Sequence, residues 1–279
     1  SLGETVIVTN EEHRFLALDQ LRELKDISAT LLLEPSGRNT APALSMAALC
    51  AQKLAKDQDP ILVITPADQT IQNPLAFTKA LQDCVASVEA TDQAICILGI
   101  TPSAPETGYG YIARSTSKDQ NNAYIVERFV EKPNEDTAKQ YLEEGAYFWN
   151  GGMFVLKASV WLAALGQYRP DILETTQQSW KTKTTDTSGD ATFVRPEKNL
   201  FNEIPSESID YAVIEKCPGS NFPIHMVELD AGWSDLGAWD AVWQVGQQDV
   251  DGNVTSGDTL LSNAKNSLVH ASSRLVSAV

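Results

Sequence analysis

A loop-forming stretch near the N-terminus carries a positive charge beside backbone groups that could bind an anion. Residues 34–43 read E-P-S-G-R-N-T-A-P-A, between an apolar run and a helical pattern. Pro, Gly and Asn allow a bent loop, Arg38 adds a cation, and the backbone amides at a helix start attract anions. The alternative is a simple connection in which Thr40 caps the next helix.

Two aspartates stand where a sheet could present them to a metal ion. Asp68 follows the apolar run 61–64, and Asp235 lies in the Gly-flanked turn 232–237. Carboxylate oxygens are the ligands that Mg²⁺ prefers, so a shared ion requires the two carboxylates to lie within about 6 Å of each other. The alternative for Asp68 is a helix cap.

Three further stretches combine groups that suit a hydroxylated, phosphorylated ligand. Residues 107–111 read T-G-Y-G-Y, residues 129–133 F-V-E-K-P, and residues 149–154 W-N-G-G-M-F. Glycines permit close backbone approach, tyrosines pack on sugar faces, lysine binds phosphate, and carboxylates and amides bind hydroxyls. The alternatives are a tight turn, a solvated charge pair and a Gly-rich turn into a strand. The candidate residues are Gly108, Tyr109, Gly110, Glu131, Lys132 and Asn150.

Composition and residue usage narrow the classes of function. The 279 residues carry 21 basic and 37 acidic side chains, a net charge of −16, which argues against nonspecific binding to nucleic acid or an anionic membrane. The cysteines form no C-x-x-C pair and the histidines no H-x-x-x-H pair, so reduced core thiols in a cytoplasmic protein are expected and a zinc site is not. The positions are Cys50, Cys84, Cys96, Cys217, His13, His225 and His270.

The elements that must position these residues alternate between short apolar runs and helical spacing. This order predicts βαβ units and a parallel sheet covered on both faces. The predicted strands are 5–9, 30–33, 61–64 and 94–100, and the predicted helices are 11–24, 41–55 and 73–89.

The second half of the chain changes character. Segments 109–114 and 124–130 are expected to form antiparallel strands, and the polar stretch 181–190 an exposed loop. After Asp240 a short helix is expected to end near residue 248. The stretch 251–279 has short apolar pairs separated by Gly, Asn and Ser, as at the start of a small β unit.

Seven stretches in order resemble the mannose-1-phosphate guanylyltransferase family of sugar-phosphate nucleotidyltransferases. They are E-P-S-G-R-N-T-A-P-A, P-A-D, E-T-G-Y-G-Y-I, F-V-E-K-P, W-N-G-G-M-F, S-I-D-Y-A-V and G-W-S-D-L-G-A-W-D. The resemblance implies an α/β, Rossmann-like domain with a mixed, mostly parallel sheet at 1–248. It also implies the start of a left-handed β-helix at 249–279, through which a homodimer is expected.

Two departures from the family pattern stand out. The family opens with a strand and a G-G-x-G-x-R-L-x-P-L loop that cradles the triphosphate; this chain has no such loop, is expected to begin after it, and should not turn over without it. The family also has His after P-A-D, where this chain has Gln69. The Gln69 amide can still donate a hydrogen bond, so we expect the substitution to adjust the activity more than to abolish it.

The resemblance implies that GTP and mannose 1-phosphate react to give GDP-mannose and pyrophosphate. Asp68 and Asp235 would hold Mg²⁺ as catalytic carboxylates, and Lys132 would neutralise the sugar phosphate. Glu131, Asn150 and the backbone at 108–110 would bind the sugar. Pro35, Gly37, Arg38, Asn39 and Asp68 would bind the nucleotide.

Two alternatives remain open. One is another sugar-1-phosphate nucleotidyltransferase with a different base or sugar. The other is a silent regulatory homologue that binds nucleotide sugar without turnover, and a pyrophosphate-release assay separates these classes.

Overall fold

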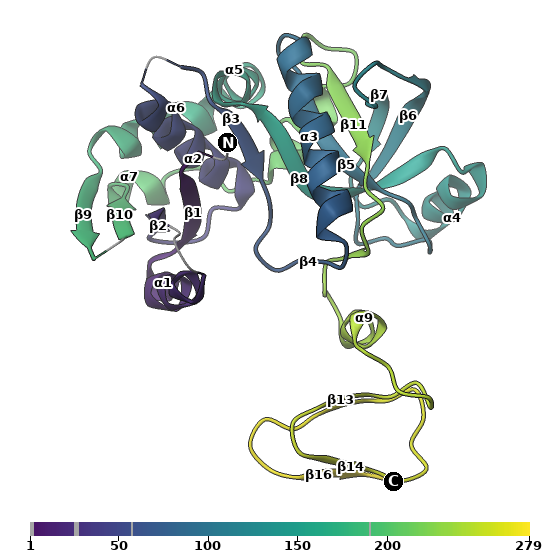
Figure 1. Cartoon of the computed structure of the whole chain (residues 1–279). Helices are drawn as coiled ribbons and strands as arrows, with labels where there is room; N and C mark the ends of the chain where they lie inside the picture. The colour runs from purple at the N-terminus through teal and green to yellow at the C-terminus, as the bar shows by residue number, and fades with distance from the viewer. Residues whose placement is uncertain (1–2, 25–27, 57, 190) are drawn as a thin grey trace. The chain divides into compact units, whose positions relative to one another are not determined.

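The chain divides into two compact units. A computed structural model describes residues 3–24, 28–56, 58–189 and 191–279 (Figure 1). Unit 1 comprises Ser1–Thr65 and Lys79–Glu228, and unit 2 comprises Pro66–Thr78 and Leu229–Val279. The division at residue 248 expected from the sequence stays a prediction.

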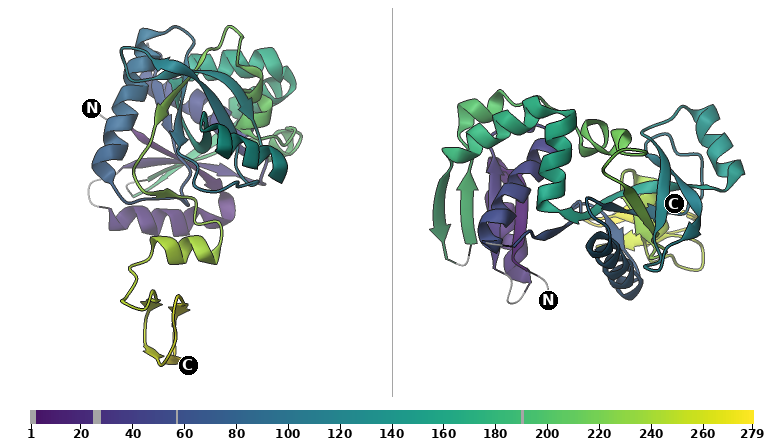
Figure 2. Two further views of the ribbon diagram at one scale, coloured as in Figure 1. Left: turned by 90° about the vertical axis from the view of Figure 1, so that its right-hand side faces the viewer. Right: turned by 90° about the horizontal axis from the view of Figure 1, so that it is seen from above.

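One sheet of unit 1 has four strands in the order β1-β2-β10-β9. Strand β2 is parallel to both β1 and β10, and β9 is antiparallel to β10 (Figure 2). The three leucines Leu31, Leu32 and Leu33 of β2 are fully or almost fully buried, as expected of a central strand. The bounds are β1 Thr5–Asn10, β2 Ala29–Glu34, β9 Thr184–Ser188 and β10 Ala191–Arg195.

Strand β9 corrects the prediction of a loop at 181–190, whose last residue lies outside the described residues. All five side chains of β9 are exposed, so no alternation of apolar and polar residues marks it in the sequence. Pairing with β10 satisfies its backbone groups along one edge. Strand β9 is thus a polar edge strand of this sheet.

The other sheet of unit 1 has six strands in the order β3-β8-β5-β11-β7-β6. The long strand β8 is antiparallel to β3, β5 and β6, whereas β11 is parallel to β5. Helix α3 (Pro74–Ala90) lies across β5 and β8 in Figure 1. The strands are β3 Ile61–Ile64, β5 Ile95–Ile100, β6 Tyr111–Lys118, β7 Tyr124–Val130, β8 Tyr147–Lys157 and β11 Ile224–Glu228.

The mixed α/β class is confirmed, and the expected helices and strands of the first hundred residues are present within a few residues of their predicted ends. One detail differs. The first four predicted strands fall into two sheets, because β1 pairs with β2 and β2 with β10, while β3 and β5 each pair with β8. Pairing with segments from much later in the chain carries no local sequence signal.

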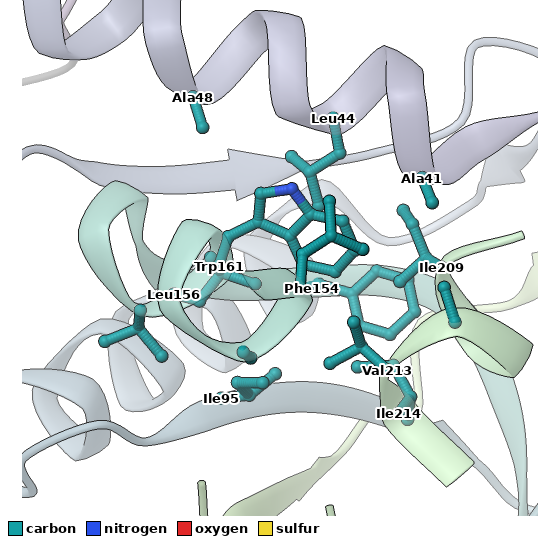
Figure 3. Packing of buried hydrophobic residues seen from close by; sticks show 14 of the residues in the cluster. Ala41, Leu44, Ala48, Ile95, Phe154, Leu156, Trp161, Ile209, Val213 and Ile214 are labelled. Carbon is teal, nitrogen blue, oxygen red and sulfur yellow. The ribbon is translucent and has the colours of Figure 1, made fainter. Parts of the chain in front are cut away.

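Helices α2 (Thr40–Ala55) and α5 (Ala158–Tyr168) pack together in the main core of unit 1. The Trp161 indole of α5 is fully buried beside Leu44 of α2, and its Nε1 donates to Ser45 Oγ at 2.9 Å (Figure 3). The donor is thereby satisfied, so burying it costs little. The remaining elements of unit 1 are η1 Glu11–His13, α1 Arg14–Glu23, α4 Glu135–Glu144, α6 Pro170–Lys181, α7 Lys198–Asn202, α8 Ile209–Ala212 and η2 Ile214–Lys216.

The four cysteines are all buried and free, which confirms the expectation of core thiols. Within the described residues, no helix has both the length and the apolar character that crossing a membrane requires.

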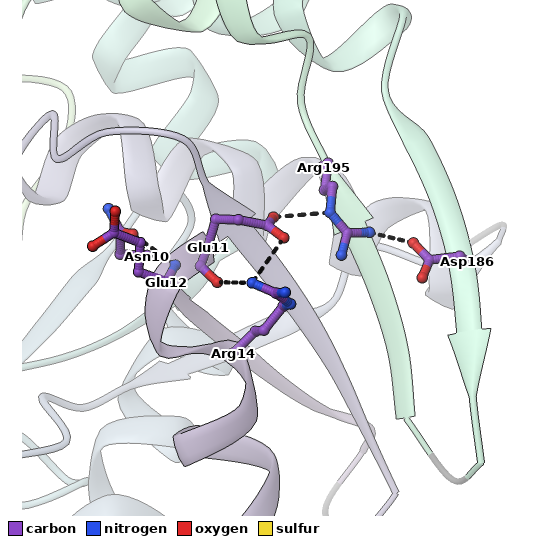
Figure 4. A network of polar contacts seen from close by, with 6 residues as sticks. All are labelled: Asn10, Glu11, Glu12, Arg14, Asp186 and Arg195. Carbon is purple, nitrogen blue, oxygen red and sulfur yellow. Dashed lines mark hydrogen bonds and ion pairs between the residues drawn. The ribbon is translucent and has the colours of Figure 1, made fainter.

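A polar network ties β9 and β10 of the four-stranded sheet to the turn after β1. Arg195 at the end of β10 donates from Nε to Glu11 Oε2 at 2.8 Å and from Nη1 to Asp186 of β9 (Figure 4). Arg14 donates to the Glu11 carbonyl oxygen at 2.8 Å. Arg195 therefore joins two strands and η1 through one guanidinium group.

Unit 2 contains a two-stranded ladder, a short helix and a coil of short strands. Strands β4 (Thr70–Ile71) and β12 (Trp233–Ser234) are antiparallel, and α9 (Trp239–Val245) follows. In the coil, β13 (Val254–Ser256) is parallel to β15 (Leu268–His270). Likewise β14 (Thr259–Leu261) is parallel to β16 (Val276–Ala278). Parallel pairs of this kind suit stacked turns, and the left-handed β-helix stays a prediction.

Candidate functional site

Strand pairing in unit 1 brings the predicted sugar-binding stretches together. Strand β6 pairs with both β7 and β8, and its Tyr111 lies opposite Val130 and Trp149. Gly110, Glu131 and Asn150 each adjoin one of these residues, so they gather where β6 begins and β7 ends, beside the first part of β8. The Asn150 amide N–H donates to the Gly110 carbonyl oxygen at 2.8 Å, and the Lys132 N–H to the Tyr109 oxygen at 3.2 Å.

Both the nitrogen and the oxygen of the Asn150 side-chain amide form hydrogen bonds. Its Nδ2 donates to Asp210 Oδ1 at 2.8 Å, and its Oδ1 accepts from the Gly152 N–H at 3.0 Å. Asp210 lies on α8, sixty residues further along the chain. Burial raises the pKa of Asp210 to about 6, and the nearby negative charge of Glu131 adds to this effect.

Glu131 presents a buried oxygen without a hydrogen-bond partner among the described residues. Its side chain is only 8% exposed, and Oε2 is the atom that lacks a partner. Its other oxygen, Oε1, lies 3.4 Å from Lys132 Nζ, and the Lys132 side chain is 55% exposed. Burial raises the pKa of Glu131, although the positive charge of Lys132 opposes that rise.

The backbone at Gly110 closely approaches the Glu131 carboxylate. A Cβ atom at residue 110 would lie 2.4 Å from Glu131 Oε2 and 3.0 Å from Phe129 Cζ. Any larger side chain would therefore displace the carboxylate or the ring. The neighbouring Tyr109 ring meets Trp149 edge to face, with 5.1 Å between centroids, and Gly108 has open space where a Cβ would stand.

The predicted nucleotide-binding loop is anchored to the segment around α7. The Arg38 guanidinium donates to the Asn202 carbonyl oxygen, and Ser36 Oγ to Asn202 Oδ1 at 2.6 Å. Arg38 Nε is buried without a hydrogen-bond partner in the described part of the chain. Pro35 is half-buried and Gly37 exposed in the same loop.

Asn39, rather than Thr40, caps helix α2, which corrects the alternative considered from the sequence. Asn39 has a positive φ of 65°, and its side chain accepts from the Thr40 N–H at 2.9 Å. Asparagine tolerates this left-handed backbone better than threonine does, because its short planar side chain can bond locally. Thr40 Oγ1 instead accepts from the Ile209 N–H at 2.9 Å, which connects the loop to α8.

Sequence reasoning missed Asp210 as a residue of the sugar-binding cluster, and it missed the burial of Glu34 at the start of the nucleotide-binding loop. Asp210 carried a weak signal, since it lies in the S-I-D-Y-A-V stretch that marked the family resemblance. Glu34 ends β2, and its Oε1 is buried with no hydrogen-bond partner within the described residues. Burial raises the pKa of Glu34 to about 7, and no sequence pattern indicates this environment.

The two predicted metal-binding aspartates lie at the same end of the short ladder in unit 2. Ser234 of β12 pairs with Thr70 of β4, so Asp235 directly follows one strand and Asp68 lies two residues before the other. Trp233 Nε1 donates to Gln69 Oε1 at 2.9 Å beside them. Their carboxylate separation of about 6 Å stays a prediction.

The donor set of this ladder fits a hard divalent cation that a ligand helps to hold. Asp235 Oδ1 accepts from the Gly237 N–H at 3.2 Å, which leaves its other oxygen available as a ligand. Among the residues that the structure describes, no group of three or more His, Cys, Asp or Glu could hold a metal by itself. Two carboxylates therefore need further oxygens, such as those of a phosphate, to complete a site.

The cluster of unit 1 has the chemistry of a site for a hydroxylated, phosphorylated molecule. Glu131 Oε2 needs a hydrogen-bond donor, and Lys132 offers an exposed ammonium group that suits phosphate. No side chain in this cluster is arranged as an activated nucleophile. The site is therefore suited to binding and orientation.

Sequence comparison finds one family model and several curated relatives. A model described as nucleotidyl transferase matches residues 1–252. A mannose-1-phosphate guanylyltransferase of Klebsiella pneumoniae is 42% identical over 100% of this chain and 57% of the relative. The xanthan biosynthesis protein XanB of Xanthomonas campestris is 42% identical over 98% of this chain and 55% of its own length. The chain thus spans little more than half the length of these relatives.

Two solved structures are similar in fold to this chain. A mannose-1-phosphate geranyltransferase of Thermus thermophilus matches with a TM-score of 0.81 and 27% identity, covering 99% of this chain and 74% of the other. A mannose-6-phosphate isomerase of Helicobacter pylori matches with a TM-score of 0.72 and 31% identity over 83% of this chain and 84% of the other.

Proposed function

Because this chain belongs to the nucleotidyl transferase family, we propose that it transfers GMP from GTP to mannose 1-phosphate. The products are GDP-mannose and pyrophosphate. The observation that carries the proposal is the cluster of Glu131, Lys132 and Asn150 around Gly110, in a chain 42% identical to a relative named for this reaction. A sugar phosphate offers the hydroxyl and phosphate groups that these side chains can bind.

The reaction is an in-line displacement at the α-phosphorus of GTP. A phosphate oxygen of mannose 1-phosphate forms the new P–O bond, and the bond to the leaving pyrophosphate breaks. No covalent enzyme intermediate is needed, which agrees with the lack of a nucleophilic side chain in the cluster. Catalysis then consists of orientation and of neutralising charge.

In unit 1, each side chain of the cluster has a distinct role in binding the sugar phosphate. Lys132 neutralises the phosphate, since its side chain is exposed and carries a positive charge. Glu131 Oε2 accepts from a sugar hydroxyl, which satisfies a buried acceptor. The backbone at 108–110 lies against the sugar. Asn150 binds the sugar with the Nδ2 hydrogen and the Oδ1 lone pair that its bonds to Asp210 and Gly152 leave over.

The loop after β2 binds the nucleotide in this proposal. Arg38 and Asn39, with the backbone at Pro35 and Gly37, border the base and ribose. The Arg38 guanidinium is oriented by Asn202, so its position is fixed before the ligand arrives. Preorganisation of this kind lowers the entropy cost of binding.

Members of this family generally use a divalent metal ion, and Mg²⁺ is the ion that Asp68 and Asp235 suit. Bound there, Mg²⁺ would neutralise charge on the phosphates. The two aspartates repel each other without a cation, so they hold Mg²⁺ weakly until nucleotide oxygens complete the shell. Asp68 thereby also takes part in nucleotide binding.

Pyrophosphate release with a panel of nucleotides and sugar 1-phosphates tests the proposed function. We expect release with GTP and mannose 1-phosphate from a protein that carries the G-G-x-G-x-R-L-x-P-L loop, and preference for another pair would contradict the assignment. Asp68→Asn and Asp235→Asn should each abolish turnover and leave the thermal unfolding midpoint nearly unchanged, because the amide keeps the shape and removes the charge. Asp258→Asn, on an exposed part of the coil, is the matched control.

We further propose a homodimer formed through the coil of unit 2. Apolar residues there, such as Leu260 and Val276, are 58% and 37% exposed, and a partner would cover them. Light scattering that shows a monomer at high concentration would count against the dimer.

A further inference from the structure

We propose that Asp210 determines which sugars the cluster of unit 1 accepts. Together with Glu131, which lies with Asn150 beside Gly110, it forms a partly buried pair of carboxylates that admits neutral, hydroxyl-bearing sugars and excludes sugars that carry a second anionic group. This inference rests on the proposed function, because it takes the ligand to be a sugar 1-phosphate. It assigns selectivity to a residue sixty positions away from its partner Asn150.

Glu131 requires a hydrogen-bond donor from the ligand. Its side chain is 8% exposed and its Oε2 has no hydrogen-bond partner in the described part of the chain. A buried acceptor left without a donor is costly, so a ligand that supplies a hydroxyl hydrogen is favoured. A ligand carboxylate supplies only acceptors when ionised and cannot satisfy this oxygen.

Asp210 is held in place by Asn150. Asn150 Nδ2 donates to Asp210 Oδ1 at 2.8 Å, and Asn150 itself is anchored to Gly152 through its oxygen. The bond from Asn150 therefore holds the Asp210 carboxylate in this position. Its charge stays beside Glu131 unless it binds a proton.

Acidic side chains outnumber the basic side chain that lies among them around the ligand. Glu131, Asp210 and Glu215 are acidic, and Glu215 Oε1 accepts from the Glu131 N–H at 3.1 Å. Lys132 is the cation placed 3.4 Å from Glu131 Oε1, and the phosphate of the ligand competes for it. The raised pKa values of Asp210 and Glu131 fit this crowding of negative charge. A second anionic group at the sugar would meet repulsion in a poorly solvated site.

Calorimetric titration of the protein with mannose 1-phosphate and with mannuronic acid 1-phosphate tests the inference. The second probe has a carboxylate in place of a hydroxymethyl group. For the unmodified protein we expect mannuronic acid 1-phosphate to bind at least about 100-fold more weakly. Binding is measured without turnover, so the result does not depend on catalysis.

Asp210→Asn is the central variant, because the amide oxygen still accepts from Asn150 while the charge is removed. In this variant we expect the preference for mannose 1-phosphate over mannuronic acid 1-phosphate to shrink to about tenfold or less. The change should come mainly from tighter binding of mannuronic acid 1-phosphate. Asp210→Ala also removes the bond to Asn150 and should weaken the binding of both sugar phosphates to a similar extent. Asp258→Asn removes an exposed aspartate in unit 2 and should leave the preference unchanged.

Each outcome decides between the two proposals. If mannose 1-phosphate binds but Asp210→Asn keeps the full preference, the inference about Asp210 is overturned and the proposed function stands. If neither sugar phosphate binds the unmodified protein, both are overturned. Glu131→Gln removes the other charge of the pair and should also narrow the preference, so the test survives if Asp210→Asn does not fold.

Discussion

Glu34 should make the protein less stable as the pH rises through neutrality. It ends β2 with a buried Oε1 that has no hydrogen-bond partner among the described residues, and burial raises its pKa from 4.5 to about 7. The folded protein therefore binds a proton at Glu34 more tightly than the unfolded chain does. The stabilisation is complete below pH 4.5 and is lost as the pH rises through 7.

The size of this effect follows from the two pKa values. A rise from 4.5 to about 7 corresponds to about 3 kcal/mol of unfolding free energy between the two ends of the range. Glu34→Gln cannot ionise, so the variant should gain about 2–3 kcal/mol relative to the unmodified protein on going from pH 5 to pH 8. Any fixed cost of burying the amide cancels, because it is the same at both pH values.

Urea unfolding followed by circular dichroism at pH 5 and pH 8 measures this difference. With a slope of about 3 kcal/mol per molar urea, the relative shift in midpoint should approach about 1 M. Glu89→Gln, on an exposed part of α3, measures the effect of the substitution without burial. If Glu34→Gln and the unmodified protein changed stability equally between the two pH values, Glu34 would be ionised in the folded protein at both, and the argument from burial would be wrong.

Three further substitutions probe the site and the fold. Lys132→Ala should weaken mannose 1-phosphate binding by about ten- to a hundredfold and GTP binding much less, since a charge-assisted contact contributes roughly 1.5–3 kcal/mol; equal loss of both ligands in calorimetry would contradict this role. Gly110→Ala places a Cβ 2.4 Å from Glu131 Oε2, so mannose 1-phosphate affinity should fall at least about tenfold, and unchanged affinity would show that the carboxylate moves freely. Arg195→Met removes the bonds to Glu11 and Asp186 and should cost about 1 kcal/mol in urea unfolding, an effect that vanishes if salt already screens the pairs.

The elements of the fold were predictable wherever local periodicity decides them. The strand at 61–64 is present with its predicted bounds, and the helix at 41–55 begins one residue earlier than predicted. Strand β8 was harder to predict, because the glycines at 151 and 152 indicate a turn, yet the strand runs unbroken from Tyr147 to Lys157. Strand β5 pairs with β8 on both sides of these glycines, with a register shift between Ile97 and Gly99, and this tertiary pairing overrides the weak strand preference of glycine.

The candidate site was predictable as a set of stretches but not as a set of contacts. The family resemblance drew attention to Glu131, Lys132 and Asn150, and the pairing of β6 with β7 and β8 brings their stretches together. The bond between Asn150 and Asp210 could not be predicted, because nothing local links residues sixty positions apart. Burial of Glu34 likewise depends on the tertiary fold and not on its neighbours in the sequence.

The pairing of β2 with β10, and of β3 and β5 with β8, has a consequence for how the chain folds during synthesis. Strand β2 is complete at residue 34, yet its partner β10 begins only at residue 191. Strand β5 must likewise await β8 and then β11 at residue 224. Neither sheet can close until most of unit 1 has left the ribosome, so its buried leucines remain exposed for much of translation. Such distant pairings also predict slow folding after denaturation, and a need for protection from aggregation while the nascent chain is incomplete.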